Sequence, residues 1–212
     1  DGELNDINGF HVTDAHVFEA LDSAASGPIE LGSVGGGTGM ICYDYKGGSG
    51  SASRLVRIGG AEFTVGVFVQ ANFGLREELT ILGRNIGGIN LEGRLRHKPV
   101  GSIIAIVATD APLMPHQLKR LARRVPMGLA RTGTVGHHGS GDLFLAFSTA
   151  NEMALSGRSS EFQVLPPASI DPLFTAVAEA TEEAVIDSMV ANVTMVGRDG
   201  NICIGLSADL LR

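Results

Sequence analysis

The stretch GTVGHHGSGDLFLAFSTAN, residues 133–151, joins a flexible loop of glycines and histidines directly to an apolar run. The run from Leu143 to Phe147 is rich in strand formers, so it predicts a strand that anchors one end of the loop in a core. Ser140 lies between two glycines, which allow a reagent or the chain's own carbonyl to approach its hydroxyl closely. Serine and glycine also dominate ordinary loops, so the spacing alone leaves a purely conformational role for Ser140 open.

The composition predicts a globular protein with a substantial core. The chain has 212 residues, 44% of them hydrophobic and 18% charged, and we expect residues 1–212 to form a single domain. The net charge of -7 and the pI near 5.3 argue against nucleic-acid and membrane partners, because such surfaces attract clustered Lys and Arg. No apolar run approaches the ~20 residues that span a bilayer. We therefore expect a cytoplasmic protein, with an upstream segment removed because the chain begins at Asp1 rather than Met.

The sequence predicts no cofactor and no metal. Cys42 and Cys203 are far apart and lie in apolar or glycine-rich surroundings, so we expect buried free thiols. The glycine-rich segment 32–39 could bind an anion through its backbone N–H groups. A strand-like run follows it and no Gly-Lys-Ser/Thr appears, which argues against a nucleotide site. A tight loop close to an active site and a structural turn both remain open.

Two segments give the strongest strand predictions. Residues 54–58 and 61–69 are β-rich runs on either side of Gly59-Gly60, which predicts a hairpin. The second run leads to Asn72, whose amide either faces a cleft or caps a turn. The β-branched run 100–108 predicts a central buried strand.

The remaining pattern mixes helices and hairpins without strict βαβ alternation, which favours a layered α+β fold with antiparallel sheet. We expect helices ending near Ser23, over residues 116–124, and from Asp171 or Pro172 to about Met189. A last hairpin is expected to turn at residues 197–201 and lead into a strand at 202–206. Residues 79–98 are predicted as a surface excursion or a small hairpin, and residues 151–168 as loop.

If Ser140 is a nucleophile, a base must take its proton and a donor must stabilise the oxyanion formed when it attacks a carbonyl. His137 and His138 titrate in a suitable range, yet a base two or three residues away on a flexible loop is poorly preorganised. Attack on the Gly139 carbonyl is another route, because it yields an ester whose hydrolysis leaves Ser140 with a free α-amine. That amine has a lower pKa than lysine and could serve as the base of the same serine.

Several long motifs together resemble the DmpA-like aminopeptidase family, the L-aminopeptidase D-amidase/D-esterases and β-peptidyl aminopeptidases. The motifs are NDINGFHVTDAHVFEALDSA at 5–24, SVGGGTGMICYDYKGGSGSASR at 33–54, VGVFVQANFG at 65–74, ATDAPLMPHQLKRLARR at 108–124, GLARTG at 128–133 and GSGDLFLAFSTAN at 139–151. Members of this family are self-processing hydrolases of the N-terminal-nucleophile type. The resemblance implies a layered αββα sandwich with mostly antiparallel sheets. Relatives carry strands and amine-binding residues ahead of the first motif, so this chain is expected to lack them.

The resemblance also implies a set of site residues. Self-cleavage is expected between Gly139 and Ser140, giving residues 1–139 and 140–212, with Ser140 as the nucleophile of the new chain. Asn72 matches the oxyanion-hole donor, and Thr181 with Glu183 matches a hydroxyl and a carboxylate two residues apart. The expected substrates are short peptides, amides or esters with a free amine, whether L-, D- or β-amino-acid derivatives, and the family precedent is a homo-oligomer.

Two other functions stay open at this point. Ornithine acetyltransferases share the fold and the self-cleavage logic, but their nucleophile is a threonine, and Ser140 argues against them. A non-catalytic homologue that never processes would keep the same fold and an intact chain.

Overall fold

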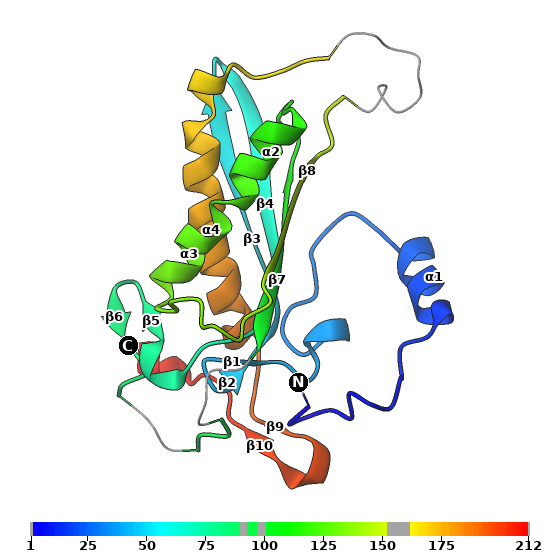
Figure 1. Cartoon of the computed structure of the whole chain (residues 1–212), viewed down its shortest axis with the longest axis vertical. Helices are drawn as coiled ribbons and strands as arrows, with labels where there is room; N and C mark the ends of the chain where they lie inside the picture. Colours follow the sequence, from blue (N-terminus) through cyan, green and yellow to red (C-terminus); the bar gives the residue numbers. More distant parts are fainter. Residues whose placement is uncertain (1, 90–92, 97–100, 152–161, 212) are drawn as a thin grey trace.

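The computed structural model describes residues 2–89, 93–96, 101–151 and 162–211. Its centre is a four-stranded sheet in the order β3-β4-β7-β8 (Figure 1). Strand β3 (Gly48–Ile58) and strand β4 (Ala61–Asn72) form the long antiparallel hairpin predicted around Gly59-Gly60, and β7 (Ser102–Thr109) pairs antiparallel with β4. Strand β8 (Leu143–Ser148) pairs parallel to β7 at the sheet edge. The α+β class with mostly antiparallel pairing is therefore confirmed.

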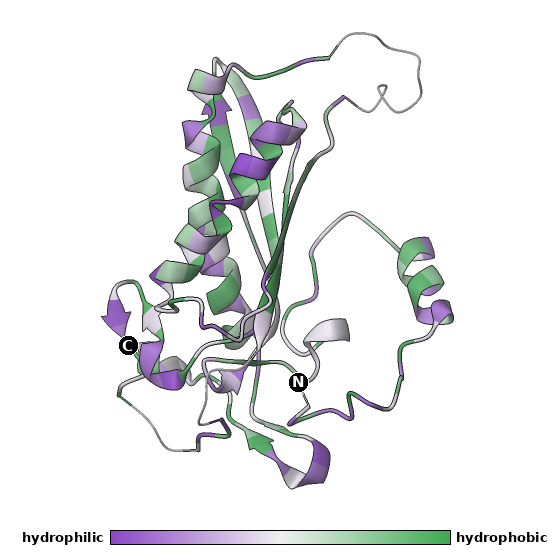
Figure 2. Cartoon of the chain, in the orientation of Figure 1, coloured by the Kyte–Doolittle hydropathy of each residue, from purple (hydrophilic) through white to green (hydrophobic). Residues whose placement is uncertain are grey.

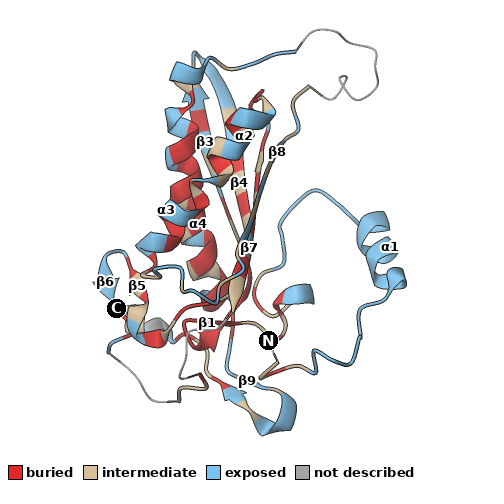
Figure 3. Ribbon diagram, in the orientation of Figure 1, coloured by how far each residue is buried: buried red, intermediate tan, exposed pale blue. Residues whose placement is uncertain are grey.

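Three helices cover one face of this sheet. They are α2 (Pro115–Ala122), α3 (Val125–Arg131) and α4 (Asp171–Val190). Helix α4 packs against β3 and β4, and α3 packs against α4. The helix-facing residues of β4 and β7 are buried valine, isoleucine and alanine, and hydrophobic residues line the interface between α4 and the sheet (Figures 2 and 3). This layer is the core of the described chain.

The other face of the sheet is open in the described residues. Strand β8 was predicted to lie in a core, but its side chains alternate, and the outward Leu143, Leu145 and Phe147 are 64%, 58% and 42% exposed. The strand register pairs these three with Ile104, Ile106 and Ala108 of β7, on the face away from the helices. The described residues thus form one four-stranded sheet with helices on one side, besides three two-stranded pairs, and the second large sheet of the expected αββα sandwich is not among them.

The smaller elements follow the predictions with some corrections. Helix α1 (Asp14–Asp22) forms where expected, but none of its residues is buried and it lies apart from the sheet (Figure 3). The excursion at residues 79–98 contains a small hairpin, β5 (Thr80–Ile81) with β6 (Arg84–Asn85). The predicted last strand is shorter than expected, because β10 (Ile202–Cys203) has two residues; it pairs antiparallel with β9 (Met195–Val196).

One further feature was not predicted, and three other predictions are settled in whole or in part. Helix α3 was not predicted, although Pro126 sits in the first turn, where proline is favoured. Strands β1 (Ile41–Cys42) and β2 (Tyr45–Lys46) form a tight pair after the glycine-rich segment. Cys42 and Cys203 are buried free thiols as predicted, and burial raises the pKa of the Cys203 thiol to about 11. Most of the loop predicted over residues 151–168 lies outside the described residues.

Gly50 lets α4 approach β3 closely, and this gives a stability prediction. A Cβ built on Gly50 would lie 1.9 Å from the carbonyl oxygen of Ala184 in α4. Gly50→Ala should therefore lower the free energy of unfolding by about 1–3 kcal/mol, because the helix must move away from the strand. Gly66→Ala in β4 is the matched control, since its nearest neighbour would be 3.9 Å away. Chemical denaturation of both variants measures the difference, and equal stabilities would contradict the packing argument.

Candidate active site

Ser140 lies in a small cavity at the end of the sheet where β7 begins. The cavity has a volume of about 20 Å³, room for about one water molecule. Its lining comes from four separate parts of the chain: Phe73, Gly74, Gly101, Leu129, Thr134, Gly136, His137, Ser140 and Asp142. Ser140 itself is half-buried, whereas Gly139 is exposed and a Cβ built there would meet nothing within 4 Å. The Gly139–Ser140 bond therefore joins an exposed residue to a residue of the cavity wall.

The Ser140 hydroxyl donates a short hydrogen bond to Oδ1 of Asp142. The same carboxylate oxygen accepts the backbone N–H of Ile103 at 3.0 Å, so the carboxylate is fixed to the first residues of β7. Gly141 lies between Ser140 and Asp142 in the chain, and its N–H donates to Oγ of Ser102 at 2.8 Å. The turn before Ser140 is closed by its own N–H, which donates to the His137 carbonyl at 2.9 Å. Ser140 is thus held on both sides, which the flexible-loop interpretation did not anticipate.

Tyr43 holds the start of the loop that leads to Ser140. Its hydroxyl lies 2.6 Å from Oγ1 of Thr132 and accepts the N–H of Thr134 at 3.1 Å. Tyr43 is fully buried and packs edge-on against Phe73, a cavity-lining residue. Burial raises the pKa of the Tyr43 hydroxyl, so it stays neutral and keeps both contacts across the ordinary pH range.

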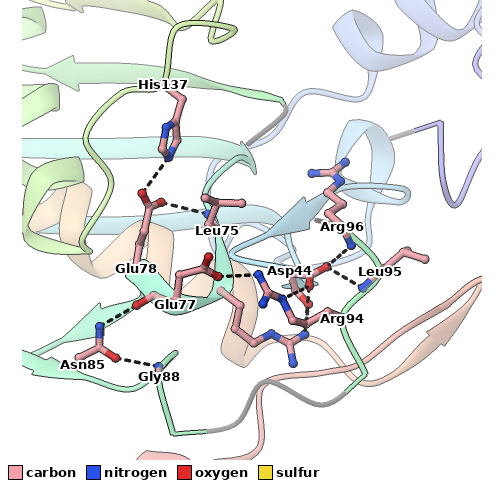
Figure 4. A network of polar contacts seen from close by, with 11 residues as sticks. Asp44, Leu75, Glu77, Glu78, Asn85, Gly88, Arg94, Leu95, Arg96 and His137 are labelled. Carbon is pink, nitrogen blue, oxygen red and sulfur yellow. Dashed lines mark hydrogen bonds and ion pairs between the residues drawn. The ribbon is translucent and has the colours of Figure 1, made fainter. Parts of the chain in front are cut away.

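His137 lines the cavity but does not contact the Ser140 hydroxyl. Its Nε2 lies 2.8 Å from Oε1 of Glu78, toward which the ring points in Figure 4. Glu78 also accepts the N–H of Leu75 at 3.0 Å through its other oxygen. His138 is exposed and does not line the cavity. The pair of His137 and Glu78 therefore ties the loop to the segment after β4, and neither histidine is placed to take the serine proton.

The side chain of Asn72 is oriented by two donors. Its Oδ1 accepts the N–H of Ile41 at 3.0 Å and Nη2 of Arg96 at 3.1 Å. Because both partners are donors, the oxygen of the amide must face them and the Nδ2 must face the other way. Among the described residues, this Nδ2 has no hydrogen-bond partner, and it would lie 3.1 Å from a Cβ built on Gly101, a residue of the cavity wall.

Strand register brings Asn72 and Ser140 to the same end of the sheet. Asn72 is paired with Ser102 across β4 and β7, and Ser102 holds Gly141 next to Ser140. Gly101 has a φ of +96°, and a Cβ there would lie 1.8 Å from the Asn72 carbonyl oxygen. Only glycine allows the chain to pass this closely. Of the predicted site residues, the structure thus brings Ser140 and Asn72 together.

Arg96 is placed beside Asn72 by a buried polar network. Oδ1 of Asp44 accepts the backbone N–H groups of Leu95 and Arg96 at 3.0 and 2.9 Å (Figure 4). The Arg96 side chain is buried and binds both carboxylate oxygens of Glu3 at 3.1 Å. This contact lowers the pKa of Glu3. This network was not predicted, because residues 79–98 were expected to form a surface excursion or a small hairpin.

The glycine-rich segment lies beside the same end of the sheet. Nζ of Lys46 donates to the carbonyls of Gly37, Met40 and Gly47 at 2.6–3.1 Å. The ammonium group is fully buried, and this burial lowers the pKa of Lys46 to about 8. The segment leads through Met40 to Ile41 of β1, whose N–H orients Asn72. The segment is therefore a structural loop next to the candidate site, and the Gly37 carbonyl within it points toward the buried Lys46 ammonium.

Thr181 and Glu183 do not line this cavity. Thr181 is fully buried in α4 and donates to the Val177 carbonyl of its own helix at 2.7 Å. Glu183 forms an ion pair with Arg54 of β3 at 2.6 Å, and its side chain is 49% exposed. Residues two apart on a helix point in nearly opposite directions, so they cannot face one site together. These contacts do not support the predicted pairing of the two residues.

Replacing Glu183 by Gln tests that predicted role. We expect a loss of less than about 1 kcal/mol in stability, because the pair is partly exposed, and an unchanged kcat because the carboxylate is bound to Arg54. Glu62→Gln, which removes another exposed pair on the same hairpin, is the matched control. A fall in kcat for Glu183→Gln alone would restore the predicted site role.

Within the described part of the chain, no cluster of three or more His, Cys, Asp or Glu side chains could hold a metal ion. No helix among the same residues combines the length and apolar character needed to cross a bilayer.

One end of the sheet thus carries the partly buried Ser140, the Asp142 carboxylate that accepts its hydrogen bond, and the Asn72 amide, whose Nδ2 has no partner among the described residues. This arrangement suits a serine nucleophile. The profile of Peptidase family S58 matches residues 1–203, and the chain belongs to this family. A curated relative, the beta-peptidyl aminopeptidase BapA of Sphingosinicella microcystinivorans, is 44% identical over 94% of this chain and 55% of its own length.

Solved structures give the same result for the fold. The L-aminopeptidase D-Ala-esterase/amidase of Ochrobactrum anthropi, described as a variant of the Ntn-hydrolase fold, matches with a TM-score of 0.91 and 46% identity over 99% of this chain and 59% of that chain. A beta-aminopeptidase of Burkholderia sp. matches with a TM-score of 0.85 and 46% identity over 99% and 60%. This confirms the family resemblance found in the sequence. The chain spans a little over half the length of these relatives.

Proposed function

We propose that this chain belongs to a self-processing serine aminopeptidase, which cleaves between Gly139 and Ser140 into residues 1–139 and 140–212. Ser140 then carries a free α-amine and attacks short peptides, amides or esters to give an acyl-enzyme. The observation that carries the proposal is the position of Ser140, which lines a cavity directly after the exposed Gly139. The Asn72 amide, whose Nδ2 is unpaired among the described residues, lies at the same end of the sheet and supports an oxyanion-binding role.

Family membership and the named activities of the relatives support the reaction class. The substrate is proposed to carry a free amine, as expected of an aminopeptidase, and no cofactor is required for this chemistry. We also propose a homo-oligomer in the cytoplasm, to be tested by sedimentation and by cell fractionation.

Denaturing gel electrophoresis with mass spectrometry tests the proposal directly. The purified full-length protein should give two fragments, the second beginning Ser-Gly-Asp-Leu. A panel of L-, D- and β-aminoacyl p-nitroanilides, with N-acetylated copies as controls, should show turnover of only the free-amine compounds. An intact chain after long incubation would overturn self-processing, and equal turnover of acetylated substrates would overturn the aminopeptidase assignment.

A further inference from the structure

Self-cleavage requires a base that is present before the α-amine exists. In the uncleaved chain the nitrogen of Ser140 is an amide, which cannot take a proton from the hydroxyl. Its N–H is moreover engaged with the His137 carbonyl. The first round of chemistry therefore needs a different group from the one that serves the processed enzyme.

Only one ionisable side chain in the described residues contacts the Ser140 hydroxyl. Asp142 accepts its hydrogen bond and lines the same cavity. The other ionisable residue of the cavity wall, His137, is turned toward Glu78. We propose that Asp142 is the base that starts self-cleavage, an inference that rests on the proposed function above.

The carboxylate is held in place for this task. Oδ1 is fixed by the Ile103 N–H at 3.0 Å, and the intervening Gly141 is fixed by Ser102 at 2.8 Å. Asp142 thus follows Ser140 by two residues yet is anchored to β7, a strand paired on both sides. This anchoring gives the preorganisation that loop histidines lack.

The proton balance of the step is complete. Asp142 takes the hydroxyl proton as Oγ of Ser140 bonds to the carbonyl carbon of Gly139, which forms a five-membered tetrahedral intermediate. The carbon–nitrogen bond then breaks, and Asp142 returns the proton to the departing nitrogen. The products are an ester between Gly139 and Ser140 and a free α-amine, and Asp142 is again a carboxylate. Water hydrolyses the ester in a later step.

Asp142→Asn removes the base and keeps the geometry. The amide oxygen still accepts from Ile103 and from the serine hydroxyl, so the loop should keep its position. Asp110→Asn is the matched control, because the Asp110 carboxylate accepts the N–H of Thr64 at 2.7 Å at the opposite end of β7. A general weakening of the sheet would affect both variants, whereas loss of the base affects only the first.

The experiment follows fragment formation after cell-free synthesis of the full-length protein, with and without hydroxylamine, which cleaves esters but not amides. We expect wild type and Asp110→Asn to cleave at similar rates. Asp142→Asn should cleave about 10²-fold more slowly or worse, and hydroxylamine should not restore it, because the ester does not form.

Three outcomes would overturn the role of Asp142. These are a wild-type rate for Asp142→Asn, an equal slowing of Asp110→Asn, and restoration of Asp142→Asn by hydroxylamine, which would place the defect after ester formation. The failure of the proposed function is distinct, since in that case the wild-type chain itself stays intact in both conditions and the inference falls with it.

Discussion

We expect Ser140→Ala to leave the chain as a single intact species and to reduce turnover of aminoacyl p-nitroanilides to background, a loss of roughly 10⁴-fold or more. The variant lacks the oxygen that attacks the Gly139 carbonyl and the oxygen that would carry the acyl group. Intact mass spectrometry and initial rates at saturating substrate measure the two effects separately.

Two control variants separate the loss of the nucleophilic oxygen from a structural effect of the substitution. Ser148→Ala removes the other serine of residues 133–151. The Ser148 hydroxyl donates to the Ala111 carbonyl at 2.7 Å at the far end of β8. It should cleave normally. Ser140→Cys keeps a nucleophile and should still form two fragments through a thioester. Two fragments from Ser140→Ala would show that the break occurs elsewhere or needs a separate protease.

Labelling can locate the nucleophile in the processed enzyme. A sulfonyl fluoride should add mass to the fragment that begins at Ser140 and to no other. A label on a different serine would remove Ser140 from the mechanism even if its loss prevents cleavage.

The elements that the sequence predicted well are those fixed by local periodicity. The β3–β4 hairpin has a Gly-Gly turn between two β-rich runs, and α4 has a long apolar stripe. Asn72 was also expected at a strand end, and it is the last residue of β4. In these cases the neighbours in sequence determine the structure, so a pattern is enough.

The parts that were not predicted depend on contacts between distant segments. Arg96 looks solvated in sequence, but Asp44, 52 residues away, holds its backbone, and Glu3 neutralises its side chain. Charged residues are buried only when paired, and pairing is not visible in a local pattern. The contact between Glu78 and His137 is hidden for the same reason.

The placement of Thr181 and Glu183 shows a different limit. A motif of two residues two apart can share one face in a strand, but in a helix it cannot. The helix itself was predicted correctly, so its periodicity already argued against a joint role for the two side chains. In β8, the apolar run was expected to anchor the loop in a core, but its outward residues are exposed in the described chain.

Asn72→Asp should lower kcat by roughly 10²-fold or more in fully processed enzyme, with a much smaller change in KM. The substitution is chosen over alanine because Oδ1 of Asn72 accepts from Ile41 and Arg96, and a carboxylate satisfies both donors. What it removes is the Nδ2 donor, which would bind the oxyanion in the transition state and the neutral carbonyl only weakly in the ground state. A negative charge beside a developing oxyanion adds to the loss.

Asn85→Asp provides the control for a lost amide donor, since Nδ2 of Asn85 donates to the Glu77 carbonyl at 2.8 Å from the exposed strand β6. Its kcat should match wild type. If Asn72→Asp is fully processed and retains kcat, the amide is a structural cap of the β4 end and the oxyanion donor lies elsewhere. If Asn72→Asp stays unprocessed, the Nδ2 donor is also needed for the oxyanion of the Gly139 carbonyl. Self-cleavage and substrate hydrolysis both pass through a tetrahedral carbonyl carbon bonded to Oγ of Ser140. Asn72 would then serve both reactions, whereas Asp142 is needed for the first before the α-amine exists.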